Sequence, residues 1–503
     1  MPDAIVIGAG QNGLVAANVL ADAGLSVVLF EAEETAGGAV RTQELVEPGF
    51  RNDTFSAFYP LAITSPAMRA MELERWGVRW CHGPLVLAHP TPDGRCIELS
   101  RDLDVTAASL DTYAQGDGDA WRELMRLWDR IEPGILRGLA TPVPPVRAGV
   151  SLLARLGPRG LLELGRTAVL PVRRFADERF KGEGAALLLG GNALHADLTP
   201  DSALGGFFGF VLAALGQRHG FPFPAGGAGA IADALVARAE TGGVTIVRGA
   251  TVERIIVHGG HTVGVHVDGE DVRAGRVLAA VSVWELDRLL GRDGTPDRDP
   301  NHHKIVEPDP AVVKVDWTLD GTVPWTAEAA RRAPVVHLAE SVDALTDYSS
   351  DLSKGDEPRH PFVVFGQYAL ADETRAPAGK DTAWAYSHVP PDAEANRVAD
   401  RMEEEVELRA PGFGTLIRGR HVALLPPGRV NGGTAQLHNQ FIFRGTRWGR
   451  PQTDVGGLYL ASFSAHPGGG VHGAGGWNAA RSALRFRPLA RLRRGAGVPA
   501  STA

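Results

Sequence analysis

Three glycines near the start of the chain have the spacing of a phosphate-binding turn. Gly8, Gly10 and Gly13 form the pattern G-x-G-x-x-G directly after a short apolar run. In such a turn the first glycine permits a tight bend, the second lets the backbone approach a pyrophosphate, and the third lets a helix pack closely on the strand. Glu31 follows about twenty residues later, where a carboxylate accepts hydrogen bonds from a ribose and repels a 2′-phosphate. These four residues predict a dinucleotide site.

The elements that must position these residues lie on either side of the turn. Residues 3–7 form an apolar run suited to a buried parallel strand, and residues 14–23 favour a helix that ends at Gly24. The run SVVLFE then predicts a second strand, which ends on Glu31. A helix N-terminus between the two strands offers free N–H groups and a positive dipole end to phosphates. The fold class predicted from this pattern is α/β. Farther along, residues 244–267 alternate like strands, with a hairpin predicted at Gly259 and Gly260.

A second pair of glycines helps to choose between NAD and FAD. Gly37 and Gly38 are followed closely by Arg41. An NAD-dependent dehydrogenase has no use for these residues, whereas the longer FAD needs more close backbone beyond the first helix. Arg41 would neutralise the pyrophosphate or lie at the flavin edge, and the alternative is a surface turn with a solvated arginine. FAD is therefore the predicted cofactor. The predicted contacts in this part of the chain are Gly8, Ala9, Gly10, Gln11, Asn12, Gly13, Glu31, Ala32, Gly37, Gly38, Ala39, Arg41 and Thr42.

Three glycine-rich blocks, in this order, carry a family resemblance. They are DAIVIGAGQNGLVAANVLADAGLSVVLFEAEETAGGAVRT, GFPFPAGGAGAIADALVARAE and GGLYLASFSAHPGGGVHGAGGWNAA. With these blocks the chain resembles the phytoene-desaturase-like FAD oxidoreductases of the flavin amine oxidase superfamily, and among them the phytoene-dehydrogenase-related branch. The resemblance implies a Rossmann-like FAD-binding domain assembled from three chain segments, with an inserted α+β substrate domain of sheet and helices.

The resemblance also implies domain boundaries and further cofactor contacts. The FAD-binding domain would comprise residues 1–70, 225–290 and 450–488, the substrate-binding domain residues 71–224 and 291–449, and residues 489–503 a disordered tail. The further FAD contacts would be Val252 at the adenine and Ala461, Ser462, Gly470 and Val471 beside the flavin. A helix that starts at Gly470 would direct its positive end to the flavin pyrimidine ring and stabilise the anionic reduced form. The alternative for residues 466–476 is a flexible loop.

His466, in the last block, is the predicted catalytic residue. Histidine is the side chain best suited to proton transfer near neutral pH, and this block is expected to pass close to the flavin. The alternative is a histidine that braces the turn before Pro467, and His472 is a weaker candidate. Residues 55–60, with the sequence FSAFYP, would either line the substrate face with aromatic rings or end a core strand.

The lysines bear on the choice of substrate. Amine oxidases of the wider superfamily often hold a water at the flavin through a lysine. None of the lysines here lies in a predicted flavin-facing block, although Lys314, in VVKVDW, stays open as such a residue. We therefore rank C–C desaturation above amine oxidation. The lysines are Lys181, Lys304, Lys314, Lys354 and Lys380.

Composition and charge exclude several classes of protein. The net charge of -8 argues against a nucleic-acid partner, because phosphate neutralisation needs a basic surface. Cys81 and Cys96 have no CxxC or zinc spacing, so no metal site is predicted and a reducing compartment is favoured. The apolar start of the chain indicates the first strand and not a signal peptide, which predicts a cytoplasmic protein. Residues 203–216 fall short of the roughly 20 apolar residues of a spanning helix and favour a buried helix.

Residues 147–174 interleave arginines with leucines and valines. Arginine stems beside an apolar face suit a peripheral contact with anionic lipid, and helices with solvated arginines explain the pattern equally well. Glu163 is the acidic residue of this run. The arginines are Arg147, Arg155, Arg159, Arg166, Arg173 and Arg174.

The predicted activity is FAD-dependent removal of hydride from an apolar polyene, isoprenoid or lipid-like substrate, with formation of a C=C bond. The alternatives are an FAD-dependent amine oxidase, a double-bond saturase or isomerase, and a flavoprotein that acts as a binding or assembly factor with little turnover. Because no second dinucleotide fingerprint follows another strand, the predicted electron acceptor is oxygen or a quinone. The sequence leaves the oligomeric state open.

Overall fold

The structure, a computed structural model, describes residues 1–292, 306–445 and 447–485. One half of it is built on a five-stranded parallel sheet in the order β19-β13-β1-β2-β9. This sheet takes strands from three distant parts of the chain, which confirms the predicted α/β class with a Rossmann-like domain made of separate segments. The strands are β1 (Ala4–Ile7), β2 (Val27–Phe30), β9 (Thr245–Val247), β13 (Val277–Ala279) and β19 (Leu458–Leu460).

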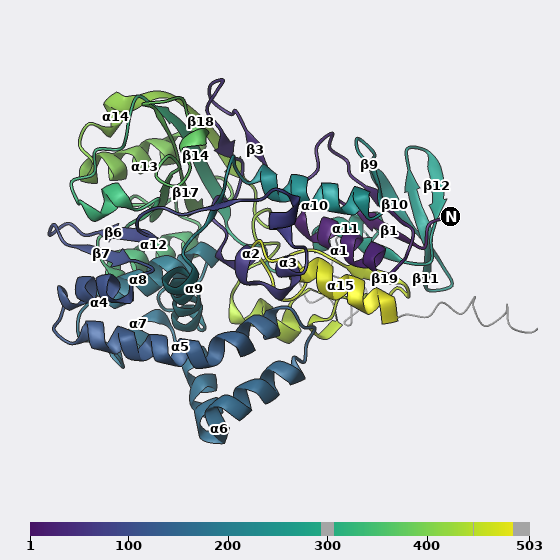
Figure 1. Ribbon diagram of the computed structural model, residues 1–503, viewed down its shortest axis with the longest axis horizontal. Coiled ribbons are helices and arrows are strands. Elements are labelled where there is room, and N and C mark those ends of the chain that lie inside the picture. The colour runs from purple at the N-terminus through teal and green to yellow at the C-terminus, as the bar shows by residue number, and fades with distance from the viewer. Residues whose placement is uncertain (293–305, 446, 486–503) are drawn as a thin grey trace, which may run out of the picture.

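Alternate residues of β1 face two different cores. Ala4 and Val6 pack with helices on one side of the sheet, whereas Ile5 and Ile7 pack with a three-stranded antiparallel sheet and a helix on the other. All four are buried, as expected for a central parallel strand that is covered on both faces. Figure 1 shows the helices of the first side lying together. They are α1 (Gln11–Asp22), α10 (Gly229–Thr241) and α15 (Ala474–Arg485); the other side has β10 (Val252–His258), β11 (His261–Val267), β12 (Glu270–Arg273) and α11 (Val283–Leu289).

The predicted hairpin at Gly259 and Gly260 is confirmed. β10 and β11 pair antiparallel up to His258 opposite His261, and the two glycines between them have φ angles of 57° and 77°. Positive φ at both turn positions matches the twist of the flanking strands, and glycine adopts it without strain.

A seven-stranded mixed sheet forms the other half of the structure, in the order β18-β14-β17-β16-β15-β6-β7. β14 lies inside it, buried along its whole length and paired antiparallel with β17 and β18. One face of β14 presents Val313, Val315 and Trp317 to α13, so the alternate residues Lys314 and Asp316 belong to the opposite face. The strands are β6 (Leu87–Pro90), β7 (Cys96–Leu99), β14 (Ala311–Leu319), β15 (Val335–Leu338), β16 (Val363–Gln367), β17 (Asp381–Val389) and β18 (Ile417–Leu425). Two short pairs are β3 (Thr42–Gln43) with β4 (Asn52–Asp53) and β5 (Trp80–Cys81) with β8 (Phe223–Pro224).

Helices surround this second sheet, and α6 projects from the body of the molecule (Figure 1). α9 contains the predicted buried helix, with Phe210, Ala213 and Ala214 buried. In the described part of the chain, no helix is both long and apolar enough to cross a membrane. The remaining helices are α2 (Pro60–Thr64), α3 (Pro66–Arg69), α4 (Leu103–Asp111), α5 (Asp117–Leu139), α6 (Val146–Ala168), α7 (Val172–Asp177), α8 (Gly184–Ala193), α9 (Gly205–His219), α12 (Val342–Lys354), α13 (Ala395–Arg409) and α14 (Phe413–Leu416).

The last helix differs from its prediction. It begins at Ala474 and not at Gly470, because Gly470 and Gly473 have φ angles of 108° and 66°, which a right-handed helix does not accommodate. A glycine-rich turn therefore separates Gly470 from the helix N-terminus. The predicted disordered tail, residues 489–503, lies outside the described residues.

Candidate functional site

In the first glycine turn, neighbouring protein atoms require glycine at some positions of the G-x-G-x-x-G pattern but not at all of them. Gly8 has a φ of 91°, and a Cβ on Gly13 would overlap the carbonyl oxygen of Gly8. Gly10, by contrast, has a φ of -65°, and a Cβ built on it would meet no atom within 4 Å. An alanine at the position of Gly10 would therefore meet no protein atom. The open space in front of it is where a pyrophosphate needs close backbone.

The N-terminus of α1 is suited to phosphate. Gly10 is its N-cap, with no side chain that accepts from the first turn and no acidic residue there. The N–H groups of such a turn have no partner inside the helix and bind an anion readily. The positive end of the helix dipole therefore lies at the open space before Gly10.

Glu31 braces this turn from the end of β2. Its Oε2 accepts a hydrogen bond of 2.6 Å from the N–H of Ala9, and its Oε1 accepts one of 3.0 Å from the N–H of Glu33. Its backbone carbonyl accepts from the N–H of Ala250, which brings the start of β10 and the buried Val252 close. The predicted adenosine contacts Glu31 and Val252 thus share one end of the sheet.

The second glycine pair packs directly on the first turn. Gly37 forms a β-bridge with Gly10, and a Cβ on Gly38 would lie 3.0 Å from the Cα of Gly10. A few residues on, Nε of Arg41 is buried without a hydrogen-bond partner among the described residues. An unpartnered buried guanidinium N–H is costly, and a phosphate or a flavin carbonyl would satisfy it. The residues present therefore fit FAD.

Side chains of the first glycine turn hold the last glycine-rich block of the sequence against the first block. Nε2 of Gln11 donates to the carbonyl of Gly470 at 3.0 Å, and its Oε1 accepts from the N–H of Gly473 at 3.1 Å. Oδ1 of Asn12 accepts from the N–H of Gly476 at 3.3 Å, and a Cβ on Gly476 would overlap the carbonyl oxygen of Asn12. Gln11 and Asn12 were predicted as cofactor contacts; the side chains of both hold the last block in place.

The other predicted contacts surround this junction. Ala461 continues from β19 and donates from its N–H to the carbonyl of Ala279 at 2.7 Å, and Ser462 follows it, buried. Val471 lies beside Gly470 and packs with the core of the parallel sheet. Ala39 is half-buried next to Gly38, whereas Ala32 is exposed at the start of its loop.

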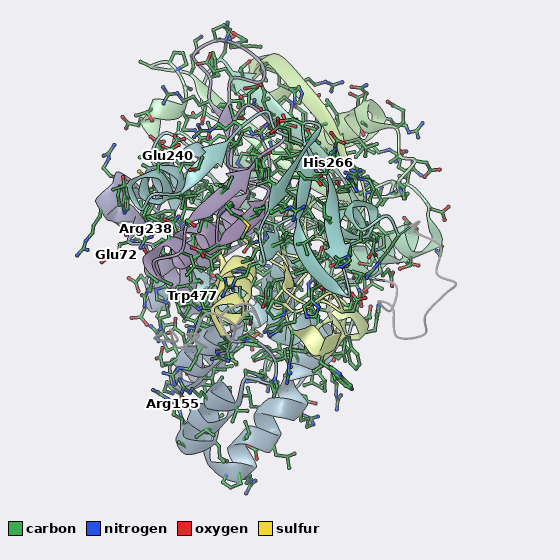
Figure 2. The ribbon with its side chains drawn as sticks, turned by 90° about the vertical axis from the view of Figure 1, so that its right-hand side faces the viewer. Glu72, Arg155, Arg238, Glu240, His266 and Trp477 are labelled. Atoms are coloured by element: carbon green, nitrogen blue, oxygen red, sulfur yellow. The ribbon has the colours of Figure 1, made fainter. Side chains whose placement is uncertain are left out.

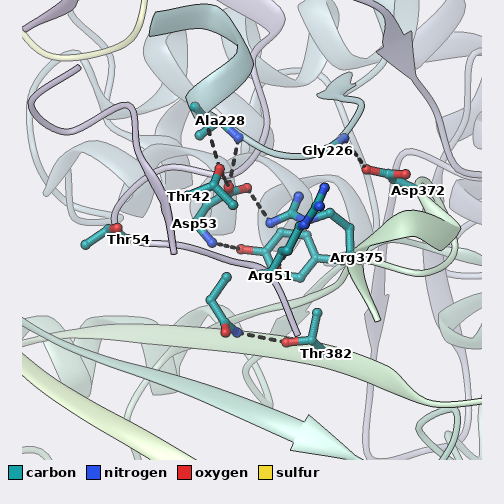
Figure 3. Close-up of polar contacts among 12 residues, drawn as sticks. Thr42, Arg51, Asp53, Thr54, Gly226, Ala228, Asp372, Arg375 and Thr382 are labelled. Carbon is teal, nitrogen blue, oxygen red and sulfur yellow. Dashed lines mark hydrogen bonds and ion pairs between the residues drawn. The ribbon is translucent and has the colours of Figure 1, made fainter. Parts of the chain in front are cut away.

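A buried polar network around Asp53 connects the two halves of the structure (Figure 3). Asp53 and Arg375 are both fully buried and form an ion pair of 3.0 Å. Oδ1 of Asp53 accepts from the hydroxyl of Thr42 at 2.7 Å and from the N–H of Ala228 at 2.8 Å. The phenol of Tyr368 lies under the Arg375 guanidinium and accepts from the N–H of Asp53. Thr42, a predicted FAD contact, is therefore held by residues from both halves.

His466 and His472 are both buried. Burial lowers the pKa of each to about 4, so both rings are neutral near pH 7. His466 is turned toward α5, with its Nε2 3.5 Å from the carbonyl of Gly138. His472 accepts from the N–H of Ala474 through Nδ1 at 3.0 Å, so it caps α15. The catalytic role of His466 stays a prediction, and its contact matches the bracing alternative.

In the half built on the seven-stranded sheet, three side chains form a hydrogen-bonded chain that the sequence did not predict. The phenol of Tyr386 on β17 lies 2.7 Å from Nδ1 of His195, and Nε2 of His195 lies 2.8 Å from Nε2 of His337 on β15. Burial lowers the pKa of His195 to about 3 and that of His337 well below its usual value, so both rings are neutral. No sequence spacing could reveal the chain, because its members are far apart in sequence.

Aromatic rings surround this polar chain. Phe58, from the predicted aromatic segment 55–60, lies edge-on to His195 at a centroid distance of 5.6 Å. It stacks on Phe221 at 4.6 Å and on Trp384 at 6.4 Å. Phe58, His195 and Tyr386 are half-buried in an otherwise closed core. The segment that follows Arg41 thus reaches the polar chain.

Lys314 lies on the same sheet face. It is directly opposite Tyr386 in the pairing of β14 with β17 and almost fully buried. Its Nζ forms an ion pair of 2.5 Å with Asp316, two residues along the strand. This lysine therefore has an internal counter-ion.

Fold and site together define an FAD-dependent oxidoreductase. Residues 6–71 match the model of an NAD(P)-binding Rossmann-like domain, and residues 145–397 match the model of flavin containing amine oxidoreductases. The second match spans half of the chain, and the chain belongs to the family of flavin containing amine oxidoreductases.

Relatives of known name span nearly the whole chain. Pyridine nucleotide-disulfide oxidoreductase domain-containing protein 2 of Mus musculus is 28% identical over 96% of this chain and 93% of its own. Hydroxyneurosporene desaturase of Cereibacter sphaeroides is 27% identical over 94% of each chain. Phytoene dehydrogenase of Streptomyces griseus is 26% identical over 82% of this chain and 80% of its own. These findings confirm the resemblance to phytoene-desaturase-like FAD oxidoreductases.

Solved structures share the fold at low sequence identity. An oxidoreductase from Methanosarcina mazei superposes with a TM-score of 0.65 at 16% identity, over 96% of this chain and 100% of that one. Putrescine oxidase with bound putrescine superposes with a TM-score of 0.60 at 15% identity, over 96% and 98% of the two chains.

Proposed function

We propose that this protein desaturates an apolar, isoprenoid or lipid-like substrate by removing hydride from one carbon and a proton from its neighbour. The observation that carries the proposal is the half-buried ring of Phe58, which lies beside the Tyr386–His195 pair and stacks on the buried rings of Phe221 and Trp384. Aromatic rings bind an extended apolar chain and exclude water. The desaturase relatives support the same substrate class.

Each product of the reaction has a destination. Bound FAD supplies a two-electron acceptor for the hydride, and oxygen or a quinone then takes the electron pair. The residual proton leaves the substrate as the C=C bond forms. The phenol oxygen of Tyr386 accepts it while the phenol hydrogen passes to Nδ1 of His195, and the Nε2 hydrogen of His195 passes to Nε2 of His337. Burial lowers the pKa of both rings, so each is neutral and has one unprotonated nitrogen before the transfer.

The cofactor residues belong to the same proposal. The backbone from Gly8 to Gly13 and the pair Gly37–Gly38 would hold the pyrophosphate with Arg41, and Glu31 and Val252 would lie at the adenosine. Ser462, Gly470 and Val471 would lie beside the flavin. The domain boundaries 1–70, 225–290 and 450–488 follow from this assignment.

An anaerobic reduction experiment tests the activity. The yellow protein is mixed without oxygen with a panel of polyenes and isoprenoids, and in parallel with a panel of amines. Bleaching of the flavin absorbance by a polyene, with a product that has one more C=C bond, is the expected result. Bleaching by amines alone would overturn it.

Amine oxidation is the second candidate, favoured by Lys314 and Asp316 on the sheet face that carries Tyr386. The fold shared with putrescine oxidase agrees with it. Bleaching by neither panel, with a stable protein partner recovered, would instead favour a binding or assembly role.

A further inference from the structure

A groove of about 890 Å³ lies on the outside of the molecule, between α15, α3 and the turn from α5 to α6. Its lining contains no acidic residue. The whole chain has a net charge of -8, so composition alone does not explain this concentration of positive charge. The arginines of the groove are Arg69, Arg137, Arg147, Arg450, Arg481 and Arg485.

Apart from Arg147, these arginines are not among those that the sequence pattern singled out. Within the described residues, Arg69, Arg137, Arg147, Arg481 and Arg485 form no ion pair with a carboxylate. Unpaired arginines at one place are suited to an anion from outside the protein.

The arginines farther along residues 147–174 are mostly neutralised. Arg159 pairs with Glu163 at 2.9 Å, Arg166 with Glu178 at 2.6 Å, and Arg173 with Asp343 at 2.6 Å. Among the arginines of this segment, Arg147, which enters the groove, and Arg155 therefore have no carboxylate partner among the described residues.

Exposed apolar side chains extend from the groove along α6. Val146, at the rim, is 64% exposed, Val150 is 60% exposed and Leu153 is 42% exposed. Spacings of four and three residues place them on one side of the helix. α6 projects at the lower end of the molecule, and in Figure 2 Arg155 on this helix and Trp477 of the groove lie on the same side.

A second set of exposed apolar residues lies beside the same turn. Phe441 is 50% exposed and Trp448 is 70% exposed. The loop that carries them contacts the turn before α6, because a Cβ on Gly449 would lie 3.2 Å from Val143 and Nε of Arg450 donates to the Val143 carbonyl at 3.3 Å. Arginines and apolar side chains therefore form one surface, which we call the arginine surface.

We infer that the arginine surface docks on a membrane that contains anionic phospholipid, with lipid phosphates in the groove and the exposed side chains of α6, Phe441 and Trp448 in the interface. Guanidinium groups bind phosphate oxygens in pairs, and apolar side chains of a projecting helix stabilise contact at the headgroup boundary. A free anion would use the arginines but not the exposed apolar residues. In the sequence, Arg485 is followed by Arg487, Arg491, Arg493 and Arg494 and by no acidic residue.

Vesicle sedimentation of the full-length holoprotein tests this inference. We expect binding to phosphatidylcholine vesicles that contain phosphatidylglycerol, little binding to phosphatidylcholine alone, and weakening by salt. The double variant Arg481→Gln/Arg485→Gln should bind about 25-fold more weakly, since each arginine near an anionic surface contributes about fivefold. The matched control is Arg159→Gln/Arg173→Gln, which removes the same charge from paired arginines and should bind nearly as the wild type.

Three results would overturn the inference. The first is equal loss of binding in the two double variants, and the second is equal binding to neutral and to anionic vesicles. The third is full displacement of the protein from vesicles by inorganic phosphate, at an ionic strength at which the control salt displaces none. The last would mark a site for a soluble anion. FAD content and melting temperature show that each variant is folded, and Val150→Glu tests the apolar part independently. Because no turnover is measured, failure of the proposed desaturation would leave this result unaffected.

Discussion

The glycine cradle and the Tyr386–His195–His337 chain lie in different halves of the structure and are built in different ways. The cradle consists of backbone from a few residues close in sequence, with Gly8 and Gly13 enforced by neighbouring atoms. The chain consists of side chains from β17, β15 and the residues after α8, brought together only by the sheet and its helices. The comparison shows that the cradle is a local property of this sequence, whereas the network of distant side chains is a property of the whole fold.

The largest effect is expected where the two regions are joined. Arg375→Ala leaves Asp53 as a buried, unpaired carboxylate, and we expect a loss of about 3–5 kcal/mol in the free energy of unfolding. Chemical denaturation measures it. The control is Arg75→Ala, whose pair with Glu72 is 73% exposed on the arginine side and should contribute about 1 kcal/mol or less. Similar losses of unfolding free energy in both variants would show that the Asp53–Arg375 pair does not stabilise the fold.

Two glycine variants test whether stability and FAD binding depend on different glycines of the cradle. Gly13→Ala should lower the stability of the FAD-free protein by about 1–3 kcal/mol, because its Cβ overlaps the Gly8 carbonyl. Gly10→Ala should leave that stability almost unchanged and weaken FAD binding about tenfold or more, since its Cβ enters the open space. Flavin fluorescence titration and thermal unfolding measure the two quantities. Unchanged FAD affinity in Gly10→Ala would place the pyrophosphate elsewhere.

The opposite region is tested by Tyr386→Phe, which removes the phenol that contacts His195. We expect kcat/KM to fall by about 100-fold with FAD affinity unchanged, the usual range for loss of a proton-transfer group. Tyr348→Phe is the matched control: its phenol donates to the His388 carbonyl at 2.9 Å, and its loss should cost about 1 kcal/mol of stability and little turnover. Equal turnover in both variants would assign Tyr386 a structural role.

The smallest expected effect is on the pH dependence of stability, and it concerns a histidine next to the glycine cradle. The pKa of His472 is lowered to about 4 by burial, so between pH 6.5 and 4 the unfolded chain binds a proton that the folded chain does not. Stability contributed by neutral His472 is therefore complete above pH 6.5 and is lost as pH falls toward 4. His472→Gln should show a shallower decline of melting temperature over this range. An identical slope would mean that other buried histidines dominate acid unfolding.

Local patterns in the sequence predicted much of the FAD-binding half. The G-x-G-x-x-G turn, its flanking strands and helix, and the hairpin at Gly259 and Gly260 depend on backbone conformations that only short-range residue choices impose. The start of the last helix was wrong, because Gly470 and Gly473 belong to a turn whose shape is set by Gln11 on a distant segment.

The tertiary structure alone decided the rest. Side chains such as Tyr386, His195 and His337 have no shared period or spacing. Only the pairing of β15, β16 and β17 and the packing of helices over that sheet bring them within hydrogen-bond distance. The same holds for the arginines: sequence shows which residues are charged, but only folding shows which find a carboxylate. Arg173 does, and Arg481 finds none in the described part of the chain. Backbone conformation is a short-range property, whereas contact between distant side chains exists only once the chain is packed.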